Sequence, residues 1–347
     1  MPDPNALLAW YGAHRRGLPW RGEADPYKVW VSEVMLQQTR AETVVPRYRR
    51  FLARFPTLER LAAASEQEVL AEWSGLGYYR RARHLHTAAR ELAALAGWPR
   101  TASGWRRLPG IGDYTAAAVA SIAFGEAIPV VDGNVARVMS RLHGLQVRRD
   151  GAGGRRRLAE LAAAWLDPQR PGDSNQALME LGATVCTPRR PRCTACPMAA
   201  ECVARRSGNP EQYPLPARQR PSEKRLLTAA VVSSGQSVLL FRRPVEQSLL
   251  NGFWELPWVE TRGDSAAIAL ERKYGGRWRL AEPHGAVRHS ITHRRLEVEV
   301  RTASWRGGDD VAEAPEAAWF DAQGLTGVPI SSLVTKALAL PRDTKSL

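Results

Sequence analysis

Long apolar stretches, acidic residues and cysteine are scarce in this sequence, and each scarcity excludes a class of protein. It has no apolar stretch long enough to cross a bilayer: the longest, residues 116–124, contains Ser121, and a span needs about 20 apolar residues. Residues 1–11 lack a basic segment followed by an apolar run, so we expect no secretory signal. Acidic residues are scarce, because 35 Asp and Glu face 49 Lys and Arg, a net charge of +14. We therefore expect a cytoplasmic protein with a polyanionic partner, either nucleic acid or an anionic membrane surface.

Cysteine is the third scarce feature, since the chain has four, all within residues 186–202. They are Cys186, Cys193, Cys196 and Cys202, in the spacing Cys-x6-Cys-x2-Cys-x5-Cys. Two disulfides would suit a small secreted protein, but a large chain without an export signal favours a metal site. Four thiolates can bind either a zinc ion or a 4Fe–4S cluster. We favour the cluster, because zinc sites usually contain two Cys-x2-Cys pairs and this sequence contains one.

The chain is long enough for two domains, and its residue pattern changes near residue 206. Residues 1–206 are predicted to be mainly helical, residues 207–225 form a proline-rich polar linker, and residues 226–347 form an α+β domain. Helices are expected over 79–96, 113–124 and 174–185, the last capped by Asp173 or Ser174, and a capping box at Ser65 and Glu68. Strands are expected over 226–232, 238–241, 295–301 and 318–320.

The segment Leu108-Pro109-Gly110-Ile111-Gly112 lies between two of the expected helices. Glycines allow backbone amides to approach an anion closely, and the following helix begins with the positive end of its dipole. Such a turn can bind one DNA phosphate without recognising sequence. An ordinary connection between two helices remains the alternative.

Two carboxylates stand in apolar surroundings. Glu33 lies in the string Val31–Thr39, and burial among apolar residues would raise its pKa and make it a proton donor. Asp132 follows the apolar residues 128–131 and precedes Gly133. The alternatives are a solvated helix acid for Glu33 and a helix cap for Asp132.

Together these segments resemble the adenine DNA glycosylase family of MutY type, in the helix-hairpin-helix glycosylase superfamily. The matching strings follow the family order across about residues 7–206. They are Leu18-Pro19-Trp20-Arg21, Ser32-Glu33-Val34-Met35-Leu36-Gln37-Gln38-Thr39, Gly75-Leu76-Gly77-Tyr78-Tyr79, Leu108-Pro109-Gly110-Ile111-Gly112, Val131-Asp132-Gly133-Asn134-Val135, Asn175-Gln176-Ala177-Leu178 and the cysteine spacing.

The resemblance implies a role for each matching residue. Glu33 matches the general acid that protonates N7 of adenine, and Asp132 matches the carboxylate that stabilises the oxocarbenium-like sugar, a division of labour also found in glycoside hydrolysis. Tyr114 and Asn134 match positions that support this pair. The implied contacts with substrate and DNA are Arg21 and Gln176 at the adenine pocket, Leu36, Gln37, Gln38 and Tyr78 as the wedge that accompanies base flipping, and Gly110 and Gly112 at a phosphate. Trp20 is implied to contact substrate or DNA as well.

The resemblance also implies the reaction and its partner. In endonuclease III-like relatives a lysine just past the hairpin attacks the sugar, but Tyr114 stands at that position here. Without an amine no Schiff base forms, so we predict base removal with little or no AP-lyase activity. The implied protein is a monomer that excises adenine opposite 8-oxoguanine or guanine from double-stranded DNA at the bacterial nucleoid, with no membrane partner. Its expected fold is an all-α domain with a 4Fe–4S loop plus an α+β Nudix-like domain.

The second domain, residues 226–347, resembles the family's Nudix-like domain, which checks for 8-oxoguanine. Thr292 and His293 match the hydroxyl and imidazole of the lesion loop, whereas Ile291 lacks the family's aromatic ring. Active Nudix hydrolases carry an acidic metal-binding box; Trp258, Ala266 and Ala267 replace parts of it here. We therefore expect no nucleotide hydrolysis.

Three other functions would explain part of the sequence. The first is a glycosylase with lyase activity on oxidised pyrimidines, and Tyr114 argues against it. The second is a non-enzymatic iron–sulfur protein that binds DNA damage, although both carboxylates are present. The third is hydrolysis of free oxidised nucleotides by the second domain, against which the incomplete acidic box argues.

Overall fold

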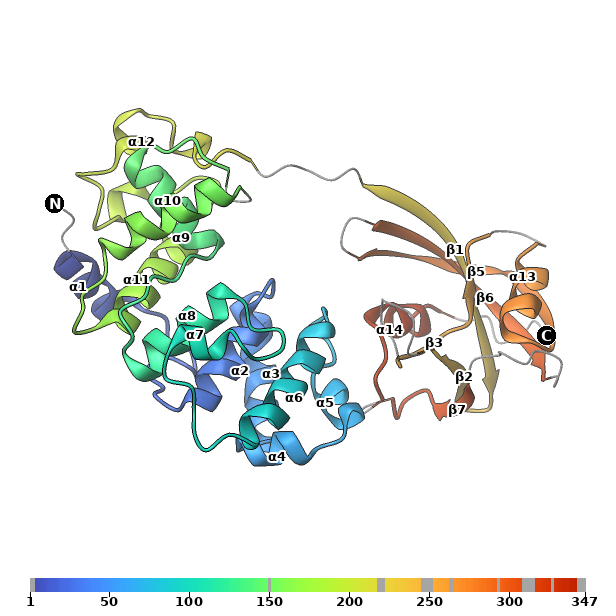
Figure 1. Cartoon of the computed structure of the whole chain (residues 1–347). Coiled ribbons are helices and arrows are strands. Elements are labelled where there is room, and N and C mark those ends of the chain that lie inside the picture. Colours follow the sequence, from blue (N-terminus) through green and yellow to red (C-terminus); the bar gives the residue numbers. More distant parts are fainter. Residues whose placement is uncertain are drawn as a thin grey trace. The chain divides into compact units, whose positions relative to one another are not determined.

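The computed structural model describes residues 4–148, 151–216, 222–244, 252–261, 265–291, 294–307, 316–325 and 328–341. The chain forms two compact units, shown with their elements in Figure 1. Unit 1 consists of Met1–Ala64 and Arg80–Gln219, and unit 2 consists of Ser65–Tyr79 and Arg220–Leu347. Within the described ranges, no helix is long and apolar enough to cross a membrane.

Unit 1 is built from helices. They are α1 (Pro4–His14), α2 (Pro26–Leu36), α3 (Ala41–Arg54), α4 (Leu58–Ala63), α6 (Arg80–Ala93), α7 (Ala102–Trp105), α8 (Asp113–Phe124), α9 (Gly133–His143), α10 (Ala152–Ala163), α11 (Pro171–Thr184) and α12 (Val203–Arg206), with short 3-10 turns at Cys193–Ala195 and Pro210–Gln212. The predicted helix over 113–124 is confirmed as α8. The predicted cap of α11 is wrong, because Pro171 occupies its first turn and Asp173 and Ser174 lie inside the helix.

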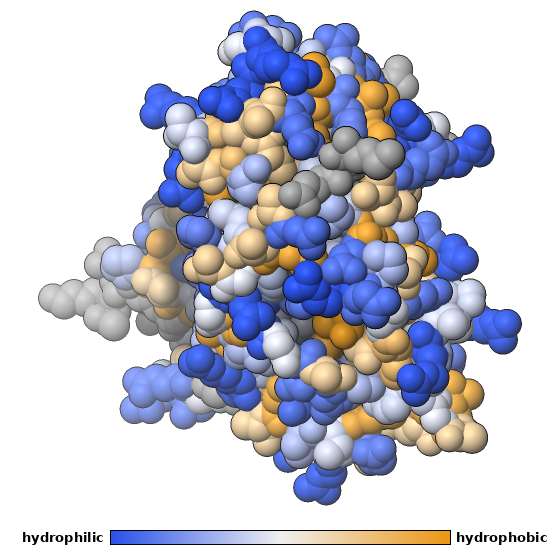
Figure 2. Space-filling view, turned by 90° about the vertical axis from the view of Figure 1, so that its left-hand side faces the viewer, coloured by the Kyte–Doolittle hydropathy of each residue, from blue (hydrophilic) through white to orange (hydrophobic). Residues whose placement is uncertain are grey.

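The core of unit 1 joins α8, α9 and α11 around small side chains. Ala117 and Ala118 of α8, Val135 and Met139 of α9, and Leu178 of α11 are all buried in one apolar cluster. Gly182 lets α11 approach α9 closely, since a Cβ at this position would lie 2.6 Å from Cβ of Asn134. This contact fixes the start of α9, where Asp132 stands, against α11. On the face of the molecule that Figure 2 shows, hydrophilic side chains surround smaller apolar areas.

Unit 2 contains a sheet, α5 (Glu66–Glu72), α13 (Ser265–Tyr274) and α14 (Ser332–Leu338). The strands are β1 (Glu223–Ser234), β2 (Ser237–Arg242), β3 (Trp254–Glu255), β4 (Trp258–Val259), β5 (Arg277–Ile291), β6 (Arg294–Arg306) and β7 (Ala317–Asp321). Their main order is β3-β2-β1-β6-β5, with β4 beside β1 and β7 beside β2. The β1–β6 pair is parallel, and the other described pairs are antiparallel.

The helices α13 and α14 cover opposite faces of this sheet. Leu227, Ala229 and Val231 of β1 share an apolar cluster with α14, while Ala230 and Val232 share another with α13. Alternate residues of a strand point to opposite faces, so the sheet lies between two helical layers. The predicted capping box of Ser65 and Glu68 is confirmed at the start of α5.

The fold class predicted from the sequence, a helical domain followed by an α+β domain, is confirmed. Each predicted strand lies within β1, β2, β6 or β7. The predicted linker contains the 3-10 turn Pro210–Gln212 and the first residues of β1, so its proline-rich composition did not exclude ordered structure.

Candidate active site

Glu33 is a buried acid near the end of α2. The residue is only 4% exposed, and its Oε2 accepts a 2.5 Å hydrogen bond from the phenol of Tyr114 on α8. Burial raises the pKa of Glu33, the Tyr114 phenol and the charge of Arg21 lower it, and the charge of Asp132 raises it. Because burial is the largest effect and raises this pKa, Glu33 holds a proton to higher pH than an exposed glutamate does.

Asp132 is both a carboxylate of the site and the cap of α9. Its Oδ1 accepts hydrogen bonds from the amides of Asn134 (2.8 Å) and Val135 (2.7 Å), and its Oδ2 accepts one from Nδ2 of Asn134 (2.8 Å). Burial is the largest effect on the pKa of Asp132 and leaves it raised, although these three donors and the charge of Arg137 lower it. Glu33 has one such donor, so Asp132 is the better prepared of the two to carry negative charge.

Tyr114 brings the two acids into one environment. Burial and the charges of Glu33 and Asp132 raise the pKa of Tyr114 well above its ordinary value, so the side chain stays a neutral phenol. Its oxygen also lies 3.6 Å from Sδ of Met179 on α11. The predicted residues Glu33, Tyr114 and Asp132 therefore gather from α2, α8 and the start of α9.

A buried ionic network stands beside this pair. Nη1 of Arg21 donates to Oε1 of Gln176 and Nη2 donates to Oε2 of Glu180, each at 2.7 Å. Arg16 also donates to Glu180, from Nε at 2.7 Å, and the Glu180 side chain is fully buried. Burial alone would raise the pKa of Glu180, but the two arginines hold it below its ordinary value. Glu180 is therefore ionised at neutral pH, and its charge fixes Arg21 and, through Arg21, Gln176.

The predicted wedge residues lie at turns with unusual backbone. Gln38 and Tyr78 are non-glycine residues with positive φ, 57° and 49°. Leu36 ends α2, and Nε2 of Gln37 donates to Oγ1 of Thr115 at 2.9 Å. Tyr78 is 47% exposed, as an inserting side chain must be. Left-handed backbone at such residues is a strain that often marks functional sites.

The predicted phosphate turn has a steric need for one of its two glycines. Gly110 has φ of 72°, and a Cβ there would lie 2.3 Å from Cβ of His84 on α6. Gly112 precedes α8 with φ of −91°, and a Cβ there would meet nothing within 4 Å. Gly110 is thus required by the packing of the turn itself, and Gly112 leaves open space before the amides of α8.

The contacts predicted for three further residues are not seen in the described part of the structure. Trp20 is 4% exposed and packs edge-on against Tyr48, with ring centroids 5.4 Å apart, so its ring is part of the core. Thr292 and His293, predicted for the lesion loop, lie outside the described residues. Their roles and the DNA contact of Trp20 stay predictions.

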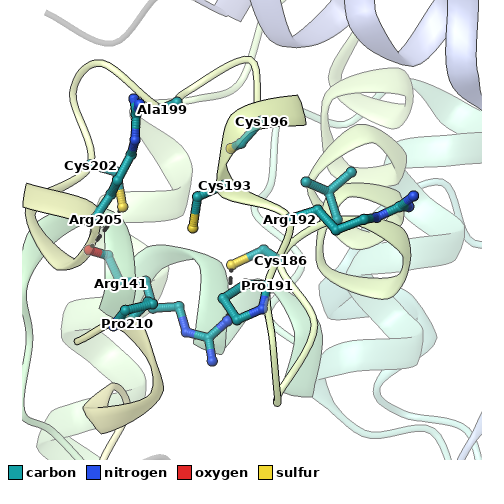
Figure 3. Close-up of a pocket in the computed structure, with 11 residues that line it drawn as sticks. Arg141, Cys186, Pro191, Arg192, Cys193, Cys196, Ala199, Cys202, Arg205 and Pro210 are labelled. Atoms are coloured by element: carbon teal, nitrogen blue, oxygen red, sulfur yellow. Dashed lines mark hydrogen bonds between the residues drawn. The ribbon is translucent and has the colours of Figure 1, made fainter. Parts of the chain in front are cut away.

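The four cysteines line one pocket in unit 1, and Figure 3 shows them around a common space. All four have free thiols. Burial raises the pKa of Cys196 to about 11, so binding a metal would have to offset the desolvation of its thiolate. Among the described residues, no group of three or more His, Cys, Asp or Glu side chains is close enough to hold a single metal ion.

Two arginines of α9 hold the cysteine loop. Nη1 of Arg141 donates to Sγ of Cys186 at 3.4 Å and to the carbonyl of Thr187 at 2.6 Å. Nε of Arg137 donates to the carbonyl of Cys186 at 2.8 Å, and its Nη2 donates to Oδ1 of Asn134 at 2.9 Å. Arg137 therefore links the first cysteine to the residue that binds Asp132.

Sequence reasoning missed Glu180 and Arg137. Glu180 follows Gln176 by four residues and Arg137 follows Asn134 by three, so each shares a helix face with a predicted site residue. That spacing was the available signal. It could not tell a solvated charge from a buried one.

The fold and the paired acids define the class of protein. Residues 31–163 match the HhH-GPD superfamily of base excision DNA repair proteins, and residues 228–340 match the NUDIX domain. A solved structure of a thermostable thymine-DNA glycosylase is similar to this chain with a TM-score of 0.54 and 30% identity, covering 59% of this chain and 95% of that one.

Curated relatives narrow the class further. The adenine DNA glycosylase of Homo sapiens is 35% identical, over 95% of this chain and 72% of the human one. That of Mycolicibacterium smegmatis is 44% identical, over 60% of this chain and 71% of its own. This chain belongs to the adenine DNA glycosylase family of base-excision repair enzymes.

Proposed function

We propose that the protein hydrolyses the N-glycosidic bond of adenine mispaired with 8-oxoguanine or guanine in duplex DNA. The observation that carries this proposal is the contrast between its two buried acids. Burial raises the pKa of both acids, but Glu33 has one hydrogen-bond donor, whereas Asp132 has three N–H donors and the nearby charge of Arg137. One acid is suited to donate a proton and the other to remain ionised.

The proton moves from Glu33 to N7 of an extruded adenine, which turns the base into a neutral leaving group. As the bond to the sugar breaks, positive charge develops on the sugar, and the Asp132 carboxylate stabilises it. Water then completes the hydrolysis. The base must leave the stack for this to occur, because Glu33 is buried and a stacked adenine cannot reach it.

Arg21 and Gln176 supply the polar edge of the adenine pocket in this proposal. Gln176 is 5% exposed, and within the described structure the buried Nε of Arg21 has no hydrogen-bond partner. An unpaired buried donor is unfavourable, and a ring nitrogen of the base would pair it. This supports a polar, planar ligand at the site.

The decisive experiment is single-turnover excision on duplexes with adenine opposite 8-oxoguanine, adenine opposite guanine, thymine glycol or uracil. We expect alkali-dependent cleavage at adenine alone, and Glu33→Gln should slow it by about 10²–10⁴-fold while duplex binding persists. Glu160→Gln is the matched control, because Glu160 is half exposed and pairs only with surface arginines. Excision by Glu33→Gln at the wild-type rate would remove Glu33 from the acid role.

The absence of an amine at position 114 supports a glycosylase without efficient lyase activity. Borohydride should trap no DNA adduct with the wild-type protein, because Tyr114 cannot form a Schiff base. Tyr114→Lys, which places an amine at the same position, is the positive control for trapping. A wild-type adduct would instead assign the lyase step to another amine.

We also propose that Cys186, Cys193, Cys196 and Cys202 hold a 4Fe–4S cluster. Four free cysteines line one pocket, and Arg141 places a positive charge against Cys186, which suits thiolate ligands. When bound, such a cluster supplies a rigid cross-link and a one-electron couple. Purified protein should absorb broadly near about 400 nm and contain iron and sulfide. Colourless protein rich in zinc would contradict this assignment.

The domain of residues 226–347 is proposed to recognise 8-oxoguanine on the opposite strand. The support is the match of residues 228–340 to the NUDIX domain, together with the sequence string Thr292-His293. His293→Ala should reduce the preference for adenine opposite 8-oxoguanine over adenine opposite guanine. The rate of excision opposite guanine should stay unchanged. Equal losses on both duplexes would place His293 outside lesion recognition. Release of pyrophosphate from free oxidised dGTP with magnesium would show a hydrolase instead.

A further inference from the structure

The end of α2, three residues beyond Glu33, is held by a single guanidinium from another helix. Nη1 of Arg81, in the first turn of α6, donates to the carbonyls of Val34 (2.9 Å), Met35 (2.9 Å) and Gln37 (2.6 Å). Its Nη2 donates to Oγ1 of Thr39 at 3.1 Å. One side chain therefore satisfies three backbone acceptors and one hydroxyl.

These carbonyls need a partner from outside the helix. The last carbonyls of any helix have no intrahelical donor, and a cation at this end also interacts favourably with the helix dipole. Many helices solve the problem with a glycine just past the end. Here that position is Gln38, whose φ of 57° is uncommon for a residue with a side chain.

The strained turn carries the residues that are expected to enter the duplex. Gln37 is tied to Thr115 through its amide, and Thr115 is next in sequence to Tyr114, which binds Glu33. A left-handed residue persists only where its surroundings fix it. Arg81 provides those surroundings, because its bonds fall on both sides of Leu36, at residues 34, 35, 37 and 39.

We propose that Arg81 is a positioning residue for base extrusion: it holds Leu36, Gln37 and Gln38 in the geometry in which they replace the adenine in the stack. This inference rests on the excision reaction proposed above. Arg81 does not touch the base in this scheme and acts through the turn. A lysine keeps the charge but has one nitrogen, so it cannot make at once the two bonds by which Nη1 and Nη2 hold Gln37 and Thr39 on either side of Gln38.

The test compares a substrate on which extrusion depends strongly on Leu36, Gln37 and Gln38 with one on which extrusion is easier. Arg81→Lys is assayed in single turnover on paired adenine opposite guanine, and on adenine opposite an abasic-site analogue, where the opposite base is missing and extrusion is easier. We expect about a tenfold loss or more on the paired duplex and at most about a threefold loss on the second, a difference of order 1 kcal/mol in activation free energy. Fluorescence of 2-aminopurine in place of the adenine, which reports unstacking, should fall in parallel.

Arg90→Lys is the matched control, because Arg90 lies on the same helix and also donates to carbonyls near a helix end, those of Ala62 and Ala64 at 3.3 Å. It should leave the ratio of the two rates unchanged. Equal losses on both substrates in Arg81→Lys, or no loss, would overturn the positioning role. Failure of the wild-type protein to excise adenine at all would instead refute the proposed function, so the two outcomes are distinguishable.

Discussion

The phenol oxygen of Tyr114 lies 2.5 Å from Oε2 of Glu33 and donates a hydrogen bond to it. This bond stabilises the ionised form of Glu33 and so opposes the effect of burial, which raises the pKa of the same carboxyl. A general acid works only while it is protonated, so the rate of excision should fall as the pH rises through the pKa of Glu33. Tyr114 therefore lowers the upper pH limit of the proposed reaction, against the larger effect of burial.

Tyr114→Phe should move this upper limit to higher pH. The substitution removes a hydrogen bond to a charged group, an interaction worth about 1.5–3 kcal/mol, and thereby raises the pKa of Glu33. The measurement is the single-turnover rate as a function of pH. Tyr27→Phe is the control, since the Tyr27 hydroxyl donates to the carbonyl of Phe55 within the core and should not affect the profile. An upper limit that stays fixed or moves to lower pH would contradict this role of Tyr114.

Glu33→Gln should make the protein more stable at neutral pH even as it loses activity. The folded-state pKa of Glu33 is raised, so its contribution to stability is fully present below the unfolded pKa, about 4.3, and is lost as the pH rises through the folded value. The gain in unfolding free energy should be of order 1 kcal/mol at pH 7 and vanish near pH 4. Urea unfolding at both pH values measures it. Equal stability of the two proteins at pH 7 would mean that burial does not raise the pKa of Glu33.

The sequence predicted the parts of this site that depend on local pattern. Glu33, Tyr114 and Asp132 could be located because each stands in a distinctive string, and helix α8 could be bounded because Gly112 and Gly125 flank it. Glu180 could not, because its charge is explained only by Arg16 and Arg21, more than 150 residues away. Strand β5 was missed for a related reason. Its pairing with β6 is irregular between Leu280 and Gly285, and this interrupts the alternation of apolar and polar residues that marks a strand.

Glu180→Gln should destabilise unit 1 and weaken excision. The variant leaves Arg21 with a buried charge and no carboxylate, and breaking a buried ion pair costs about 3–5 kcal/mol. The pKa of Glu180 is lowered, so its stabilising effect is present above about pH 4.3 and is lost as the pH falls through the folded value. The loss in unfolding free energy relative to wild type should therefore shrink in acid, as the gain in Glu33→Gln does, but with the opposite sign.

Glu160→Gln again provides the control for Glu180, because an exposed ion pair is worth at most about 1 kcal/mol. Excision by the Glu180 variant should be measured at a temperature well below its unfolding midpoint, so that the loss reflects Arg21 and Gln176 and not unfolding. A difference in stability that grows in acid would show that the Glu180 carboxylate is not the charged partner of Arg21.

Asp132→Ser should separate the two roles of Asp132. Serine caps a helix about as well as aspartate, so the unfolding free energy should change by less than about 0.5 kcal/mol. The carboxylate is lost, however, and excision should fall by about 10²-fold or more, as it does when a group facing developing charge is removed. Thr57→Ala gives the reverse case: Thr57 caps α4 through the amide of Arg60, so its loss should cost about 1 kcal/mol of stability and leave excision unchanged. If Asp132→Ser kept full activity, capping α9 would be the whole function of Asp132, and the positive charge on the sugar would need another partner.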